Sequence, residues 1–312
     1  MKLSKKDTVT KEYMEDNAIF ADAFNFYIYN GEQVIKPEKL KAIDTTEIAL
    51  PYGGKNEVVP IQKLRDVTKV AMADDNAAYL LLGIENQSDI HQAMPVRNML
   101  YDAIQYSSQV ADIANSHRKG KDKADTNAEY LSGFYSTDKL LPVITLTIYF
   151  GADEWDAPKS IHDMFSVKDE NILKFIPDYR LNLITPADIA DKDFSKFHTE
   201  LNIALKYIKY SKDKNKLLNI IETDKAYKSV SKRTADMVSI VTNSDLKFST
   251  REERVDMCEA IEGIKNDALN EGISEGKLEA FSGLVKDGII TIEEAAKRSG
   301  LTVEEFKNKL NK

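Results

Sequence analysis

Two acidic residues are spaced so that they could meet at one end of a β-hairpin. Two apolar runs, at 64–72 and 77–87, flank the cluster Asp-Asp-Asn at 74–76. Strand-forming runs on either side of such turn residues are typical of a hairpin. If the strands pair about that turn, Asp66 lies opposite Glu85. The sequence therefore predicts that one pair of strands brings two carboxylates together.

The same register would bring an amide close to both acids. Side chains alternate between the faces of a strand, so Glu85 and Gln87 share one face. Residues opposed across a ladder also share a face, so Asp66 would join them. A shift of the register by one residue would separate the three groups. The hairpin register is therefore the condition on which any joint chemistry depends.

Two carboxylates in close contact favour a bound cation. When both are ionised they repel each other, which raises one pKa unless a positive charge lies between them. A hard divalent cation such as Mg²⁺ takes one or two carboxylates and completes its shell with water and substrate phosphate. Such a cation can activate water and stabilise a phosphoryl transition state. The alternative is that Asp66 and Glu85 are ordinary polar ends of two strands.

The segment after the hairpin predicts a helix with a polar face. The helix runs from Pro95 to about His117, since proline suits the first turn of a helix. Arg97, Tyr101 and Gln105 follow at intervals of four residues and therefore lie on one face. A cationic, hydrogen-bonding face beside a carboxylate pair is suited to a phosphodiester backbone. The combination points to nucleic acid as the ligand.

These motifs, in this order, resemble those of a known family. The run Arg-Asp-Val, then Gly-Ile-Glu-Asn-Gln, then Pro-Val-Arg-Asn-Met-Leu-Tyr is similar to the Rpn family of recombination-promoting nucleases, also described as transposases of the PD-(D/E)XK superfamily. Residues 16–25 resemble the family's N-terminal helix, and residues 140–151 resemble its late core strand. The resemblance extends from Tyr13 to the helices past Asp191.

The resemblance implies a fold and an activity. The fold would be of the α/β class, with a mixed central sheet flanked by helices and a helical C-terminal extension. We divide the chain accordingly into a nuclease-like core at 13–190, a helical extension at 191–250 and a C-terminal helical tail at 251–312. The implied activity is Mg²⁺-dependent cleavage of DNA, with Mn²⁺ as a substitute, associated with recombination and mobile elements.

The family's functional residues carry over where this sequence matches the motifs. Asp66 and Glu85 match the motif acids that bind metal, and Asp22 matches an acidic residue of the first helix that can complete the metal site. Gln87 stands where the wider superfamily has lysine, and it would position the attacking water. The polar face of the helix after the core would contact DNA. Its residues are Arg97, Tyr101 and Gln105.

The glutamine at 87 leaves two functions open. A neutral amide can orient water but cannot supply positive charge to the transition state, and Lys69 lies an odd number of positions from Asp66, so it faces away. The formal net charge of −8 is also the wrong sign for a simple DNA-binding protein. The chain is therefore either a metal-dependent DNA endonuclease or a catalytically weak nucleic-acid-binding or regulatory protein on the same fold.

Length and composition bear on the remaining classes. A chain of 312 residues can bury a substantial core. Cys258 is the single cysteine, so no intramolecular disulfide can form, which fits a reducing cytoplasm. The sequence shows neither a signal-peptide pattern nor a run of ~20 apolar residues. We therefore expect a cytoplasmic protein without a membrane span.

The other elements follow from periodicity and turn residues. Residues 1–12 are polar and expected to fray. A helix is predicted at 13–29, where apolar residues recur at helical spacing, and Asn30-Gly31 ends it. The nearly continuous apolar run at 143–150 predicts a strand covered on both faces. Residues 175–184 predict another strand.

Residues 193–244 are predicted to be helical and contain the most basic stretch. Its lysines are Lys206, Lys209, Lys212, Lys214 and Lys216. We interpret them as solvated helix ends rather than as a DNA contact. The charged run at 118–123 is usually only a solvated connection, but in this place it could also follow a nucleic-acid backbone. The acids around Trp155 are interpreted as a rim loop and not as a second metal site.

The C-terminal tail contains two helix-start signals. Thr291 with Glu294 and Thr302 with Glu305 have capping-box spacing, and Ser299-Gly300 lies between them as a turn. The tail is therefore predicted to form a helix-turn-helix-like pair. No cationic recognition face stands out in it, so we favour packing or self-association as its role.

Overall fold

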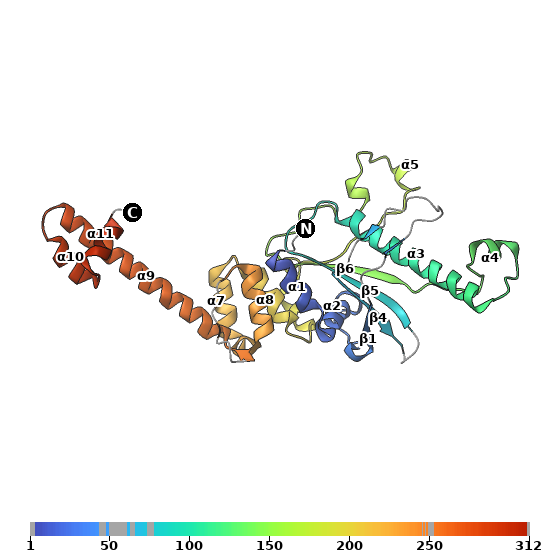
Figure 1. Cartoon of the computed structure of the whole chain (residues 1–312), viewed down its shortest axis with the longest axis horizontal. Coiled ribbons are helices and arrows are strands. Elements are labelled where there is room, and N and C mark those ends of the chain that lie inside the picture. Colours follow the sequence, from blue (N-terminus) through green and yellow to red (C-terminus); the bar gives the residue numbers. More distant parts are fainter. Residues whose placement is uncertain are drawn as a thin grey trace.

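The fold is built around a five-stranded mixed sheet (Figure 1). The computed structural model describes residues 4–43, 48–49, 61–62, 66–73, 78–244, 246, 248 and 253–310. The strands, in their order across the sheet, are β1 (Leu40–Ala42), β4 (Val67–Met72), β5 (Ala78–Gln87), β6 (Val143–Tyr149) and β7 (Asn182–Ile184). β1, β4 and β5 pair antiparallel, and β5, β6 and β7 pair parallel. The predicted α/β class with a mixed central sheet is confirmed.

The β4–β5 hairpin has the predicted register. Val67 lies opposite Ile84, and the same register continues to Ala71 before it shifts at Met72. The turn cluster predicted at 74–76 lies outside the described residues. The register decides which side chains share a face. The odd-numbered residues of β5 therefore face one side of the sheet and the even-numbered residues face the other.

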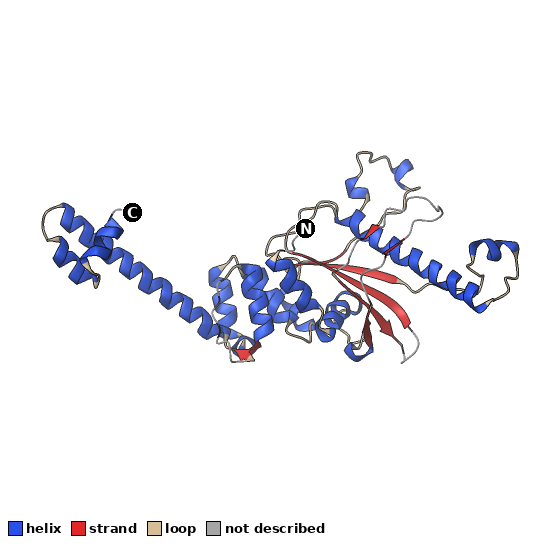
Figure 2. Cartoon of the chain, viewed as in Figure 1, coloured by secondary structure: helices blue, strands red, loops and turns tan. Residues whose placement is uncertain are grey.

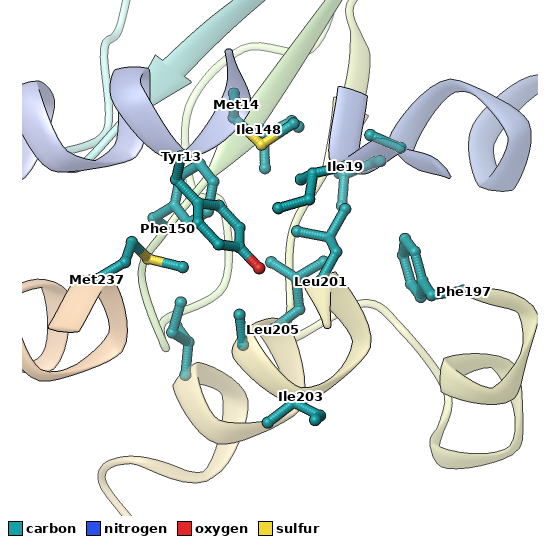
Figure 3. Packing of buried hydrophobic residues seen from close by; sticks show 14 of the residues in the cluster. Tyr13, Met14, Ile19, Ile148, Phe150, Phe197, Leu201, Ile203, Leu205 and Met237 are labelled. Carbon is teal, nitrogen blue, oxygen red and sulfur yellow. The ribbon is translucent and has the colours of Figure 1, made fainter. Parts of the chain in front are cut away.

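One face of the sheet forms the main hydrophobic core. Leu82 and Ile84 of β5 and Ile148 of β6 belong to it and are fully buried. The helices that cover this face are α1 (Lys5–Met14), α2 (Asn17–Tyr29), α6 (Leu201–Tyr210) and α8 (Lys232–Thr242). Figure 3 shows the side chains that converge from these helices and from β6, among them Tyr13, Met14, Ile19, Ile148, Leu201, Leu205 and Met237.

The opposite face of the sheet is polar and packs against one long helix, α3 (Met94–Gly120). Nδ2 of Asn98 donates a hydrogen bond to Oγ1 of Thr147 at 2.8 Å. Oγ1 of Thr145 donates to Oδ1 of Asp102 at 2.5 Å. The helix has Pro95 in its first turn, as predicted, and runs past the sheet toward α4 (Asn127–Ser132) (Figures 1 and 2).

The N-terminal region differs from the prediction. Residues that were expected to fray form α1, which begins with a capping box between Ser4 and Asp7. The single helix predicted at 13–29 is instead parts of two helices, because the Asp16 side chain accepts hydrogen bonds from the first turn of α2 and starts it anew. Helical periodicity did not reveal the break because both helices bury apolar residues in the same core. Asn30, with φ of 54°, ends α2 as predicted.

The strand predicted at 175–184 forms only at its end. β7 covers its last three residues and pairs with β6. The backbone N–H of Leu181 instead donates to the carbonyl of Lys159 at 2.8 Å. The prediction was wrong over 175–181 because backbone groups there pair with the preceding loop instead of the sheet.

Short helices and ladders connect the larger elements. The helical region after β7 was predicted as helices, and it contains α6, α7 (Lys214–Thr223) and α8. The remaining short elements are η1 (Pro37–Lys39), β2 (Ile48–Ala49), β3 (Ile61–Gln62), η2 (His162–Met164), α5 (Glu170–Leu173), η3 (Asp191–Lys196), η4 (Lys225–Lys228), β8 (Val230–Ser231) and β9 (Arg254–Val255). None of the helices in the described ranges combines the length and the hydrophobicity needed to cross a membrane.

The basic stretch of the helical region is largely neutralised within the fold. Its lysines form ion pairs with aspartates, namely Lys206 with Asp224, Lys209 with Asp191, and Lys212 with Asp153. Lys212 is 69% exposed and fits the interpretation of the stretch as solvated helix ends, whereas Lys206 and Lys209 are only 21% and 17% exposed and do not. The acids around Trp155 include Asp153, and Trp155 itself is buried beside Tyr149. The segment is a loop, as predicted.

The C-terminal helices lie away from the sheet (Figure 1). α9 (Met257–Lys286) leads to α10 (Ile292–Ser299) and α11 (Val303–Leu310), which pack around Phe306 in a small separate cluster. The N–H of Glu294 donates to Oγ1 of Thr291, and that of Glu305 donates to Oγ1 of Thr302, both at 3.2 Å. The predicted pair of capped helices is confirmed. The three-part division of the chain stays a prediction.

Candidate functional site

Asp66 stands at the start of β4 and is bound to the neighbouring strand. Its Oδ2 accepts a hydrogen bond from the backbone N–H of Asn86 in β5 at 2.8 Å. The β4–β5 register, extended by one residue, places Asp66 opposite Glu85. The hairpin therefore brings together the two acids that the sequence analysis paired.

Glu85 is buried, and an arginine of α3 compensates its charge. The side chain of Glu85 is 0% exposed, and its Oε2 lies 3.1 Å from Nη2 of Arg97. Nε of Arg97 also donates to the hydroxyl of Tyr101 at 3.0 Å. Burial acts to lower the pKa of Arg97, but the Glu85 charge and the Tyr101 hydrogen bond outweigh burial and raise it. Arg97 therefore keeps its positive charge beside the Glu85 carboxyl.

The Asp66 carboxyl lies in an environment that disfavours its charge. Burial raises the pKa of Asp66 above its usual range. The N–H of Asn86 and the charges of Arg97 and Lys11 act in the opposite direction, and Asp7 adds to the rise. Asp66 therefore holds a proton more readily than an exposed aspartate does. A cation beside it would favour its ionised form.

Helix α1 brings a further carboxylate to the edge of this site. Oδ1 of Asp7 accepts a hydrogen bond from the hydroxyl of Ser88, the residue after β5, at 2.6 Å. Burial acts to raise the pKa of Asp7, but hydrogen bonds from Ser88 and Ser4 lower it overall. Lys11 lies one turn further along α1, and its charge reaches Asp66. The N-terminal helix is thus part of the electrostatic environment of the site.

Asp22 is used elsewhere in the fold. It lies on α2, which packs on the apolar face of the sheet, and is 1% exposed. Its carboxylate accepts hydrogen bonds from the backbone N–H groups of His198 and Thr199 and from the Thr199 hydroxyl, at 2.6–3.0 Å. Among the described residues, no three His, Cys, Asp or Glu side chains are grouped so as to hold a metal. The structure therefore does not bring Asp22 together with Asp66 and Glu85.

Gln87 and Lys69 lie on opposite faces of the hairpin. Gln87 shares the face of Glu85, and its Nε2 donates to the carbonyl of Asn86 at 2.9 Å. Lys69 points to the apolar side, where its Nζ donates to the carbonyl of Glu15 at 2.7 Å. The prediction that Lys69 faces away from Asp66 is confirmed. Lys69 therefore cannot take the place of a lysine at position 87.

The polar face predicted on α3 is turned toward the sheet. Tyr101 is buried, and Gln105, one turn further on, is half-buried. The side chain of Arg97 is 29% exposed. Arg97 therefore connects the buried Glu85 carboxylate with the surface of the protein.

Comparison with known proteins identifies the family. The family model described as "Putative transposase, YhgA-like" matches residues 62–236, more than half of the chain. The chain belongs to this family. No curated protein and no solved structure matches it. The match confirms the resemblance to the Rpn-type proteins, and membership of a transposase family indicates a role on DNA.

The YhgA-like match includes most of the candidate site but not all of it. Asp66, Glu85 and the whole of α3 lie within the matched residues, whereas α1 precedes them. Asp7 and Lys11 were not predicted as site residues. The spacing from Ser4 to Asp7 is a signal for a helix start. It contains no information on which distant strand that helix contacts.

Proposed function

We propose that this protein is a metal-dependent DNA endonuclease in which Asp66 and Glu85 hold the metal and Arg97 binds a phosphate of the substrate. The observation that carries the proposal is the 2.8 Å hydrogen bond that ties Asp66 to β5 next to Glu85. It places a carboxyl of raised pKa beside a buried carboxylate. Membership of a transposase family supports DNA as the substrate.

The donor set fits Mg²⁺ or Mn²⁺. Carboxylate oxygens are the ligands that such hard cations prefer, and one or two of them suffice when water and substrate phosphate complete the shell. The raised pKa of Asp66 shows that its charge is incompletely compensated, so a divalent cation would stabilise the ionised carboxylate. When bound, the cation would supply an activated water and stabilise the charge that develops on the phosphate.

The protein's own residues would bind and orient the substrate. Arg97 keeps its positive charge and is partly exposed, so it can pair with a phosphate oxygen. Tyr101 holds Nε of that arginine and limits its motion. Gln87 offers a neutral carboxamide on the same face, which can orient water by hydrogen bonding. Lys11 is a second positive charge whose field reaches Asp66.

Nicking of supercoiled plasmid tests this proposal. We expect the wild type to nick DNA with Mg²⁺ or Mn²⁺ and not with a chelator present. Asp66→Asn and Glu85→Gln should each lower the rate at least ~100-fold, since either change removes a charge from the metal ligands. Both variants should be checked for folding by thermal melting. Equal rates in well-folded variants and wild type would overturn the assignment.

A catalytically weak nucleic-acid-binding or regulatory role is the second candidate. It is favoured by the contact of Lys69 with Glu15, which leaves β4 and β5 without a lysine on the Glu85 face among the described residues. Gln87→Lys separates the two functions. A rate that rises with Gln87→Lys would show an assembled but weak site. Metal-independent DNA binding without cleavage by either protein would favour the regulatory role.

The C-terminal helices are our proposed site of self-association. α10 and α11 form their own apolar cluster, which shares no residue with the main core in the described ranges. A chain that ends after Gly263 keeps the start of α9, where Met257 is buried in the main core. We expect the intact chain to sediment as an oligomer and the shortened chain as a monomer that still cleaves DNA. A monomeric intact chain would refute this role.

A further inference from the structure

The ion pair between Arg97 and Glu85 joins the two groups that the proposed function needs for its ligands. The Glu85 carboxylate would bind the metal, and the Arg97 guanidinium would bind a phosphate of DNA. Nη2 of Arg97 lies 3.1 Å from Oε2 of Glu85. The carboxylate is fully buried, whereas the arginine side chain is 29% exposed. The guanidinium therefore lies between a metal-binding carboxylate and the surface from which DNA arrives. Arg97 therefore contacts the Glu85 carboxylate and can also reach DNA at the surface.

Positive charges at this position compete with each other. A guanidinium and a divalent cation both gain from the negative charge of Glu85, and they repel each other at short range. A metal ion that binds the free protein must therefore crowd or displace Arg97. Displacement into solvent would leave the arginine without its charge partner. Both costs weaken the binding of metal to the protein without DNA.

A phosphodiester removes both costs. Its oxygens accept hydrogen bonds from a guanidinium in the same planar arrangement as a carboxylate does. When a phosphate arrives, Arg97 can exchange Glu85 for it, and the Glu85 oxygen becomes accessible to the metal. The bond to Tyr101, at 3.0 Å, uses Nε, a different nitrogen from the Nη2 that contacts Glu85. Tyr101 can therefore act as a positioning residue that holds Nε while Nη2 changes partner.

We propose that the Arg97–Glu85 ion pair couples metal binding to DNA binding, so that each ligand strengthens the binding of the other. The proposal rests on the endonuclease function given above. It adds that the free protein binds the divalent cation weakly and the DNA-bound protein binds it strongly. By linkage, the metal raises the affinity for DNA by the same factor. The protein without DNA therefore stays largely without metal.

Titration calorimetry with Ca²⁺ tests the coupling without relying on turnover. The Ca²⁺ dissociation constant is measured for the full chain alone and with a saturating short duplex. We expect the duplex to tighten Ca²⁺ binding on the order of tenfold. Arg97→Gln should bind Ca²⁺ more tightly than the wild type without DNA, and the duplex should no longer change its affinity. Equal affinities with and without duplex in the wild type would overturn the coupling.

Further variants protect this test against loss of fold. Arg97→Gln removes the guanidinium beside the buried Glu85 carboxyl, so the folding of this variant is checked by thermal melting. Arg97→Lys keeps the charge, and it should retain a weakened coupling. Tyr101→Phe removes only the hydroxyl that holds Nε, and it should lower the coupling without changing Ca²⁺ affinity in the free protein. Arg180→Gln is the matched control, because Arg180 is 81% exposed and pairs with Asp178.

Asp66→Asn distinguishes a failure of the proposed metal site from a failure of the proposed coupling. If it abolishes Ca²⁺ binding while the wild type shows no coupling, the metal site stands and the ion-pair coupling is wrong. If it leaves Ca²⁺ binding unchanged, the metal does not bind at the two acids and the endonuclease assignment itself is wrong. Loss of Ca²⁺ binding together with coupling that Arg97→Gln removes would support both.

Discussion

Ser88 donates a hydrogen bond from its hydroxyl to Oδ1 of Asp7 at 2.6 Å, and so joins the first helix to the end of strand β5. The two residues are far apart in the chain, and neither has a functional signature in sequence. Their contact places an ionised carboxylate beside Asp66 and fixes α1 against the strand that carries Glu85. The N-terminal helix therefore contributes to the candidate site as well as to the core.

Asp7→Asn should lower DNA cleavage without unfolding the protein. Asparagine can still accept the Ser88 hydrogen bond, but it removes a negative charge close to Asp66. We expect a fall in rate on the order of tenfold, since the variant loses one nearby charge and no direct metal ligand. The rate is measured in the plasmid assay, with Glu12→Gln on the exposed side of α1 as control. A rate equal to that of the wild type would remove Asp7 from the site.

Asp66→Asn should stabilise the metal-free protein at neutral pH. The pKa of Asp66 is raised by burial, so its contribution to stability is present at low pH and lost as the pH rises through the folded pKa. Removing the charge should raise Tm by about 3 °C. With a short duplex present, Mg²⁺ should raise Tm for the wild type only, because the variant lacks the Asp66 carboxylate. A lower Tm for metal-free Asp66→Asn would contradict this account.

Asp153→Asn is the matched control for the melting experiment. The Asp153 side chain is 59% exposed and pairs with Lys212. An exposed pair of this kind contributes little to stability. We therefore expect its Tm, with or without Mg²⁺, to follow that of the wild type.

Asp22→Ala should destabilise the fold and leave metal affinity unchanged. The substitution removes the acceptor of the buried N–H groups of His198 and Thr199, which costs about 3 kcal/mol in the free energy of unfolding. Urea denaturation measures this loss, and calorimetry with Ca²⁺ measures the affinity. Asp22→Asn keeps one oxygen acceptor and should be milder. Loss of Ca²⁺ binding in a folded Asp22 variant would return this residue to the metal site.

The loop after α3 should loosen as the pH rises. The ring of His117 lies 2.8 Å from Asp122 and 2.9 Å from Asp138, and it stacks on Tyr135. Hydrogen bonds to the two aspartates raise the pKa of His117 above its ordinary 6.5. The stability that this histidine contributes is therefore fully present below about pH 6.5 and lost as the pH rises through the raised pKa.

An NMR titration of His117 with amide exchange across 121–138 checks this dependence. We expect the ring to titrate above pH 6.5, and the loop amides to exchange faster beyond the pKa of His117. Asp138→Asn should move that pKa downward, because it removes one of the two charged acceptors. A histidine that titrates at or below 6.5 in the wild type would disprove the effect.

Sequence patterns predicted those parts of the fold that depend on interactions between residues close in sequence. The alternation along β5 and the turn residues before it were enough to predict the register that pairs Asp66 with Glu85. Four-residue spacing predicted that Arg97, Tyr101 and Gln105 share one face of α3, but not that this face is turned toward the sheet. Capping-box spacing predicted the two short C-terminal helices. Each of these features depends on residues close in sequence.

The parts that sequence reasoning missed depend on distant partners. Asp22 binds backbone groups of His198 and Thr199, and no periodicity on its own helix could show where those donors would lie. The stretch at 175–181 has strand-forming residues, but its backbone pairs with a preceding loop. Asp7 was expected in a frayed N-terminus, because the sequence near it gives no sign of its hydrogen bond with the distant Ser88. In each case the deciding interaction spans a large separation in sequence.

Alternate residues of strand β5 face opposite sides of the sheet and have different roles. Its even positions, such as Leu82 and Ile84, hold the protein together, whereas its odd positions include Glu85 and Gln87 on the polar side. A substitution at an odd position changes chemistry and scarcely touches the apolar core behind it. Substitutions that remove the proposed metal ligand Glu85 or the proposed water-positioning Gln87 would therefore leave the apolar side of β5 in place. A chain of this fold could thus lose the proposed chemistry and keep its scaffold.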